Sequence, residues 1–227
     1  LGTSGVVFVS GEHFAPNPAQ GLHAFCHALP GRWHQMSVML SAASAVTWAA
    51  KQLAFGDEAS LLAAAAQLPQ ADRRMAPLFL PYLSGERTPH NQPLATASWF
   101  GLTAAHRREA LAYAVAEGVA LGLRDGLQTL GSPEPALQSL SLVGGGAKSA
   151  MWAQQLASCL GVHIVTHSGS AAGGALGAAR LGWLADGGDM TTVCVAPDVD
   201  QTYAPQPEEA QLLAPRYERF RRLYSEA

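Results

Sequence analysis

Apolar and polar residues alternate in the first forty positions as they do in β-strands. Leu1–Ser10 is apolar around Val6, Val7, Phe8 and Val9, and a glycine-flanked turn precedes this apolar run. Gly21–Leu29 and Arg32–Met39 read as two further strands, because Pro30-Gly31 between them is a typical turn pair. The pattern therefore predicts an N-terminal strand followed by an antiparallel hairpin.

Apolar residues recur at steps of three and four after position 39, which favours helices. Asp57 is a suitable N-cap for the alanine-rich segment Asp57–Gln67, and Arg107–Gly131 has the clearest helical pattern. We read Pro69–Arg74 as a linker and Leu78–Leu83 as a short strand. Strands and helices then alternate, which predicts a mixed α/β protein with a parallel strand pair. The further expected elements are a helix within Met39–Phe55, a buried strand at Gln138–Val143, a helix at Lys148–Leu160, a strand at Val162–Thr166, a helix at Ala171–Ala185 and a charged tail helix from Pro205.

Composition narrows the class of protein. The 227 residues are 48% hydrophobic and 14% charged, with a formal net charge of −3, so the body of the chain is not intrinsically disordered. Nucleic-acid binding needs a basic surface, and the sequence does not predict one. Cys26, Cys159 and Cys194 are far apart, which favours buried thiols in a reducing compartment. No segment has the pattern of a signal peptide or a membrane span, so we expect a cytoplasmic protein with no membrane partner.

Two glycine-rich segments are the strongest chemical signals. Gly144, Gly145, Gly146 and Ala147 follow a predicted strand and precede a helix, an arrangement that suits either a nucleotide phosphate or a tight turn. A P-loop would need glycine at Leu142 and Ala147, and the dinucleotide fingerprint also fails, so neither motif applies. The second segment, Gly2-Thr3-Ser4-Gly5, suits phosphate oxygens or a plain β-turn.

Other polar residues give weaker signals. His23, Cys26, His27 and His34 lie near a predicted hairpin, and His163/His167 span a strand end, so we expect no metal site. No acid–base pair for catalysis stands out along the chain. Glu86, Arg87 and His90 belong to a polar loop, which either faces a cleft or forms a surface loop with an Arg–Glu pair. The arginines near the C-terminus fit a solvated amphipathic helix better than a phosphate site.

Six segments in a fixed order resemble the C-terminal domain of the FGGY carbohydrate kinases, and in particular the bacterial xylulokinase branch. The segments are LGTSG (1–5), FCHALPGRWHQMSVMLSAASAVTWAAK (25–51), FLPYLSGERTPHNQP (79–93), WFGLT (99–103), LVGGGAKSAMWAQQLASCLG (142–161) and GALGAARL (174–181). The resemblance covers nearly the whole chain and weakens after Ala185. It implies an actin-like ATPase domain with a ribonuclease-H-like core, in which helices flank a mixed sheet.

The resemblance also implies roles for individual residues. Gly2, Thr3 and Ser4 match the loop that contacts the ATP phosphates, and Gly144, Gly145, Gly146 and Ala147 match the adenosine motif. Ala43 and Thr47 match positions that border the nucleotide in related glycerol kinases. Ala150 stands where glycerol kinases carry an asparagine near the adenine, and Ala110 and Ala116 depart from the helix signature of the family.

By this resemblance, residues 1–227 are the nucleotide-binding half of a sugar kinase that acts with MgATP on D-xylulose. The catalytic aspartate of the family would precede Leu1, and the N-terminal sugar-binding domain would be absent, so we expect no turnover by this chain alone. The expected partners are ATP or ADP, the N-terminal domain and, in the intact enzyme, the sugar; a homodimer is compatible with the sequence. Kinases of ribulose, gluconate or glycerol, or a non-catalytic nucleotide-binding scaffold, remain alternatives.

Overall fold

The computed structural model describes residues 1–131, 136–169 and 173–226. The first sheet of the chain is antiparallel. β1 (Gly5–Gly11), β2 (His23–Cys26) and β3 (Trp33–Met39) lie in the order β1-β3-β2, with a 3₁₀ turn η1 (Pro18–Gln20) before β2. Val7 of β1 pairs with Ser37, and Phe25 of β2 pairs with His34. The predicted N-terminal strand and hairpin are confirmed.

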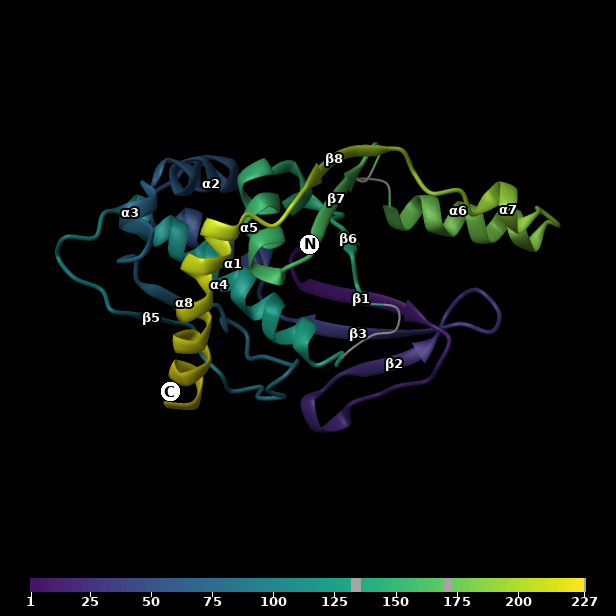
Figure 1. Cartoon of the computed structure of the whole chain (residues 1–227), viewed down its shortest axis with the longest axis horizontal. Coiled ribbons are helices and arrows are strands. Elements are labelled where there is room, and N and C mark those ends of the chain that lie inside the picture. The colour runs from purple at the N-terminus through teal and green to yellow at the C-terminus, as the bar shows by residue number, and fades with distance from the viewer. Residues whose placement is uncertain (132–135, 170–172, 227) are drawn as a thin grey trace.

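A second sheet has the strand order β6-β7-β8 and lies above the first in the view of Figure 1. Its strands are β6 (Ser139–Ser141), β7 (His163–His167) and β8 (Val199–Tyr203). β6 and β7 are parallel, which confirms the predicted parallel pair, and β8 runs antiparallel to β7. The prediction of a buried strand at 138–143 is wrong in extent and burial, because β6 is a three-residue edge strand whose Ser139 and Ser141 are exposed. A small ladder joins β4 (Leu78–Leu80), shorter than predicted, to β5 (Ser98–Phe100).

Helix α4 is the centre of the core. The helices around it are α1 (Ala43–Gln52), α2 (Glu58–Gln67) and α5 (Ala150–Leu160), and α4 itself spans Arg108–Gln128. Fifteen of its 21 residues are buried. A Cβ on Gly118 would lie 2.3 Å from the carbonyl oxygen of Phe79, so only glycine lets α4 pack this closely against β4.

Three further segments complete the helices. The predicted linker contains a short helix, α3 (Gln70–Arg73), because Pro69 precedes residues that can adopt one helical turn. α6 (Gly173–Ala185) and α7 (Met190–Val193) lie at one end of the molecule, apart from the two sheets (Figure 1). The predicted positions 171 and 172 of the helix before Ala185 lie outside the described residues. No described side chain of α6 is buried.

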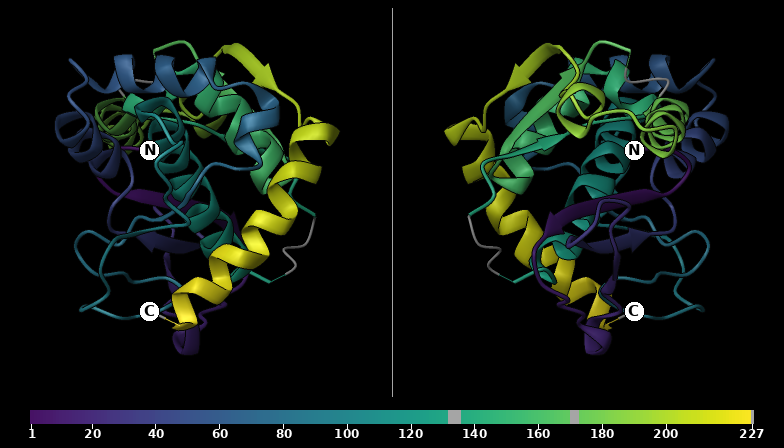
Figure 2. Two further views of the ribbon diagram at one scale, coloured as in Figure 1. Left: turned by 90° about the vertical axis from the view of Figure 1, so that its left-hand side faces the viewer. Right: turned by 90° about the vertical axis from the view of Figure 1, so that its right-hand side faces the viewer.

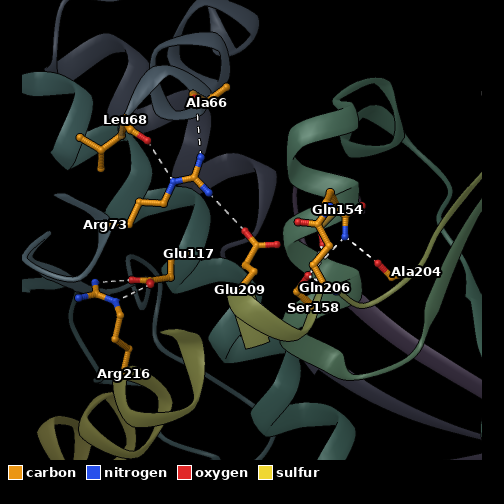
Figure 3. Close-up of polar contacts among 10 residues, drawn as sticks. All are labelled: Ala66, Leu68, Arg73, Glu117, Gln154, Ser158, Ala204, Gln206, Glu209 and Arg216. Carbon is orange, nitrogen blue, oxygen red and sulfur yellow. Dashed lines mark hydrogen bonds and ion pairs between the residues drawn. The ribbon is translucent and has the colours of Figure 1, made fainter. Parts of the chain in front are cut away.

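The tail helix α8 (Pro207–Glu226) contacts α5 and β4 and crosses the molecule diagonally (Figure 2). The prediction that its arginines are all solvated is wrong at Arg216, which is only 9% exposed. Its guanidinium donates to both carboxylate oxygens of the fully buried Glu117, with Nη2 at 2.6 Å from Oε2 (Figure 3). Further N–H groups of Arg216 donate to the carbonyl oxygens of Arg74, Ala76 and Pro77. All five N–H donors of the guanidinium therefore have partners, which offsets the cost of burying the charge.

The described residues also bear on cysteines, metals and membranes. Cys26, Cys159 and Cys194 are free thiols, but Cys26 and Cys194 are exposed, so the expectation of buried thiols holds only for Cys159. Among these residues no group of three or more His, Cys, Asp or Glu side chains is placed to hold a metal ion. None of the helices described is both long and apolar enough to cross a membrane.

Candidate functional site

Three segments that are distant in the sequence line one cavity of about 580 Å³. They are the N-terminal turn, the helix pair α1 and α2, and the glycine-rich turn together with the start of α5. Six of the residues expected at a nucleotide site line this cavity: Gly2, Thr3, Ala43, Thr47, Gly145 and Gly146. The volume lies within the range of typical small-molecule sites. The remaining expected residues, Ser4, Gly144 and Ala147, line neighbouring hollows.

The backbone carbonyl oxygens of the N-terminal turn accept hydrogen bonds from the start of α1. The N–H of Ala43 donates to the carbonyl oxygen of Gly2 at 2.9 Å, and the hydroxyl of Ser44 donates to that of Thr3 at 2.9 Å. The Ser4 hydroxyl donates to the carbonyl oxygen of Leu40 instead, at 3.3 Å. These bonds hold the exposed Gly2 and Thr3 at the cavity mouth without using the Thr3 hydroxyl.

The glycine-rich turn packs directly against the N-terminal turn. Gly144 has a φ of +90°, and a Cβ there would lie 2.7 Å from the carbonyl oxygen of Leu1. Gly146 donates its N–H to that same oxygen at 3.2 Å. Residues Gly145–Lys148 then form one 3₁₀ turn, η2, and a Cβ on Gly145 would meet nothing within 4 Å. Gly144 and Gly146 therefore serve close packing, whereas Gly145 leaves open space in the cavity.

Glu58 is the one carboxylate among the cavity-lining residues, and the sequence analysis missed it. The Thr47 hydroxyl lies 2.6 Å from its Oε1, and donation by Thr47 holds the pKa of Glu58 below its usual range. Asp57 caps α2 by accepting the N–H of Ser60 at 2.7 Å, as predicted. That cap places Glu58 in the first turn of α2. Its position directly after the N-cap residue was the signal in the sequence that could have identified it.

The rest of the cavity wall is apolar and was also missed. Ala59, Leu62 and Ala63 of α2 face it on one side, with Met151 and Trp152 of α5 on the other. The Trp152 indole is buried, and its Nε1 donates away from the cavity to the carbonyl oxygen of Ala116 at 3.0 Å. These residues meet only through the packing of α2 against α5, which no local pattern reveals.

The polar loop of Glu86, Arg87 and His90 lies outside this cavity. Glu86 is 2% exposed and accepts the backbone N–H groups of Leu40 at 2.9 Å and Arg87 at 2.7 Å. Burial raises its pKa to about 7. The alternative of a surface Arg–Glu pair is wrong for Glu86, because its carboxylate holds backbone groups and is buried.

His90 and Arg87 face different surroundings. His90 Nε2 lies 3.1 Å from the Tyr82 hydroxyl, and its ring stacks on Tyr224 of α8 with the centroids 3.4 Å apart. Burial, with the nearby Arg221 charge, lowers the pKa of His90 to about 4. Arg87 is exposed and lines a separate hollow beside Phe25. The structure does not bring the three residues of this loop to one site.

The cavity suits a ligand that combines an anion with an apolar ring. Backbone N–H groups at glycine turns and the start of α5 favour negative charge, and the aliphatic wall favours a flat apolar group. Mg²⁺ is held in proteins by carboxylates together with phosphate oxygens. Glu58 alone is not a metal site, so Mg²⁺ fits here only as part of a Mg–nucleotide substrate.

Residues 1–185 match the model of the FGGY family of carbohydrate kinases, C-terminal domain. The chain is 46% identical to a xylulose kinase of Escherichia coli K12 and 43% identical to one of Klebsiella pneumoniae. These alignments cover 100% and 99% of this chain, but only 47% and 46% of the relatives. The chain therefore spans about half the length of the curated relatives it matches.

Solved structures give the same result. A kinase from Brucella ovis, described as a xyloylose kinase, matches with a TM-score of 0.91 and 41% identity, over 100% of this chain and 46% of that one. A ligand-bound xylulose kinase from Lactobacillus acidophilus matches with a TM-score of 0.83 and 29% identity, over 99% of this chain and 45% of that one. The mixed α/β arrangement is thus the actin-like ATPase fold of these kinases. The chain belongs to the FGGY family of carbohydrate kinases and corresponds to the C-terminal domain of these enzymes.

Proposed function

We propose that this chain is the ATP-binding half of a sugar kinase that transfers the γ-phosphoryl of MgATP to D-xylulose, giving D-xylulose 5-phosphate. One observation carries the proposal: Gly2, Thr3, Ala43, Thr47 and Gly145, from three separate parts of the chain, line one cavity. The volume of this cavity and its mixture of glycine turns and apolar wall fit a nucleotide. The relatives named xylulose kinase support D-xylulose as the acceptor.

The cavity residues have distinct roles in this proposal. Thr3 and Gly145 offer backbone N–H groups, and Thr3 a hydroxyl, to the phosphate oxygens, whereas the N–H of Gly2 donates to the carbonyl oxygen of Ser4 at 3.1 Å and shapes the turn. The Glu58 carboxylate, held by Thr47, accepts a hydrogen bond from a ribose hydroxyl through its second oxygen. Phosphoryl transfer depends on positioning and charge stabilisation, so holding the nucleotide rigidly is the contribution of this chain.

The group that takes the proton from the sugar hydroxyl lies, in this proposal, on the N-terminal domain of the enzyme. Glu58 is the one carboxylate lining the cavity, and its hydrogen bond to Thr47 gives it a binding role. The isolated chain therefore binds nucleotide but does not phosphorylate sugar. Choice among xylulose, ribulose, gluconate and glycerol depends on the same N-terminal domain.

Calorimetric titration of the chain with MgADP tests the proposal, with Gly145→Asp and Gly145→Asn as paired variants. Both side chains have room at this position, so both variants fold. A carboxylate beside the phosphates repels them, and Gly145→Asp weakens binding on the order of 100-fold, whereas the uncharged Gly145→Asn weakens it much less. Absence of MgADP binding to the unaltered chain would contradict the proposal and favour a non-catalytic scaffold.

A further inference from the structure

The two ends of the cavity differ in polarity, and this difference assigns the parts of a nucleotide. The glycine turns at Gly2 and Gly145 lie at one end of the cavity, whereas the cavity-lining residues of α2 after Glu58 are all aliphatic: Ala59, Leu62, Ala63 and Ala66. Charged phosphates are costly against an aliphatic wall. The base must therefore lie along α2, opposite Met151 and Trp152.

Hydrogen-bonding side chains near this wall are already used elsewhere. The Trp152 indole N–H donates to Ala116. Ser149 caps α5 by accepting the backbone N–H of Trp152 at 3.3 Å, and its own N–H donates to the carbonyl oxygen of Gly146, so its hydroxyl lies beside the glycine turn and not on the aliphatic wall. Glu58 Oε1 accepts the Thr47 hydroxyl, and the second oxygen of Glu58 is assigned to a ribose hydroxyl in the proposed function. Thr3 and Lys148 belong to the glycine segments at the phosphate end. No side chain on the wall itself is free to read the edge of a base.

The backbone groups of α2 along the wall are used as well. The residues of α2 bond within their helix, and at its C-terminal end Arg73 donates to the carbonyl oxygen of Leu68 at 3.1 Å and to that of Ala66 at 3.5 Å (Figure 3). An exocyclic amino group, as on adenine, needs such an acceptor to be recognised. Arg73 also pairs with Glu209 of α8 at 3.5 Å, which holds its guanidinium at the end of α2.

We propose that the site takes purine nucleotides as a class, with little discrimination among adenine, guanine and hypoxanthine. This inference rests on the proposed nucleotide-binding function and narrows it to the class of phosphate donor. A pocket that hydrogen-bonds a substrate group rejects analogues by about 10⁴-fold or more, whereas an apolar pocket discriminates far less. Pyrimidines bind more weakly for a different reason, because a smaller ring buries less apolar area against α2.

Titration of the chain with MgADP, MgGDP, MgIDP and MgUDP tests the inference. We expect the dissociation constants of MgGDP and MgIDP to lie within about tenfold of that of MgADP, and MgUDP to bind less tightly than all three. Binding of MgADP more than about 100-fold tighter than MgIDP would overturn the inference and leave the proposed function standing. Failure of every nucleotide to bind would overturn both.

A variant pair tests where the base lies. Ala63→Leu places a larger side chain on the exposed wall of α2, and leucine is a good helix former, so the fold is retained. We expect it to weaken MgADP, MgGDP and MgIDP equally, by about tenfold, with an unchanged melting temperature. The control Gln67→Leu, on α2 but outside the cavity, leaves all three unchanged. Undiminished binding to a folded Ala63→Leu variant would show that the base does not lie along α2.

Discussion

The cavity between α1, α2 and α5 and the attachment of α8 to α4 are built from different groups. Glycines, small aliphatic side chains and backbone hydrogen bonds shape the cavity, and Thr47–Glu58 is its main side-chain pair. The attachment of α8 is instead a set of buried polar side chains. Arg216 holds Glu117, and the Tyr217 hydroxyl donates to the buried Asp125 at 2.6 Å. The first region contains an open cavity, whereas the charges of the second are paired within the protein.

The two regions should contribute differently to stability. In a backbone turn of small residues, the free energy of unfolding changes little when a side chain is replaced, provided that the new side chain has room. A buried ion pair is different, because removing one partner leaves the other charge without water or a counter-charge. Substitutions in the cavity should therefore change binding, and substitutions in the α8 attachment should change stability.

The largest expected effect is the loss of Arg216. Arg216→Ala leaves Glu117 buried without its partner, and we expect the free energy of unfolding to fall by about 3–5 kcal/mol in urea denaturation. The control Arg222→Ala, at an exposed position of the same helix, should stay within about 0.5 kcal/mol of the unaltered chain. Equal stability of the two variants would show that the Arg216–Glu117 pair does not secure α8.

A smaller effect, dependent on pH, is expected at Glu86. Its pKa is raised from 4.5 to about 7, so the folded state binds its proton more tightly than the unfolded state does. The stability this provides is present below pH 4.5 and is lost as the pH rises through 7. Glu86→Gln keeps an oxygen for the N–H groups of Leu40 and Arg87 without the charge.

We therefore expect the free energy of unfolding of Glu86→Gln to equal that of the unaltered chain near pH 4.5. At pH 8 the variant should be more stable, by on the order of 3 kcal/mol. Urea denaturation at the two pH values measures this difference directly. His90 titrates in both proteins and cancels from the comparison. A stability difference that stays constant from pH 4.5 to 8 would contradict the assignment of the buried proton to Glu86.

Local patterns in the sequence predicted most elements of the fold. Alternating apolar and polar residues predicted the first sheet, and apolar residues at steps of three and four predicted α1, α2, α4 and α5. Turn residues predicted the hairpin at Pro30-Gly31. The errors are short elements whose extent depends on neighbours. β6 pairs with β7 over three residues only, and α3 is one turn after Pro69.

The candidate site divides in the same way. Glycine-rich turns are recognisable in a sequence, and Gly2 and Gly145, which the sequence singled out, do line the cavity. Met151 and Trp152 line it only because α5 packs against α2. The Arg216–Glu117 pair joins residues 99 positions apart, and no local spacing indicates it. Glu86 was expected in a polar loop, but the packing of its loop against Leu40 buries it.

In the proposed function, three separate segments form one nucleotide site, apart from the α8 attachment. Hydrogen–deuterium exchange, measured by mass spectrometry with and without saturating MgADP, distinguishes the two regions. We predict slower exchange in peptides covering residues 1–5, 43–48 and 144–152, and no change in residues 84–90 and 212–224. Protection confined to the second group, or no protection in the first while MgADP is bound, would contradict the account.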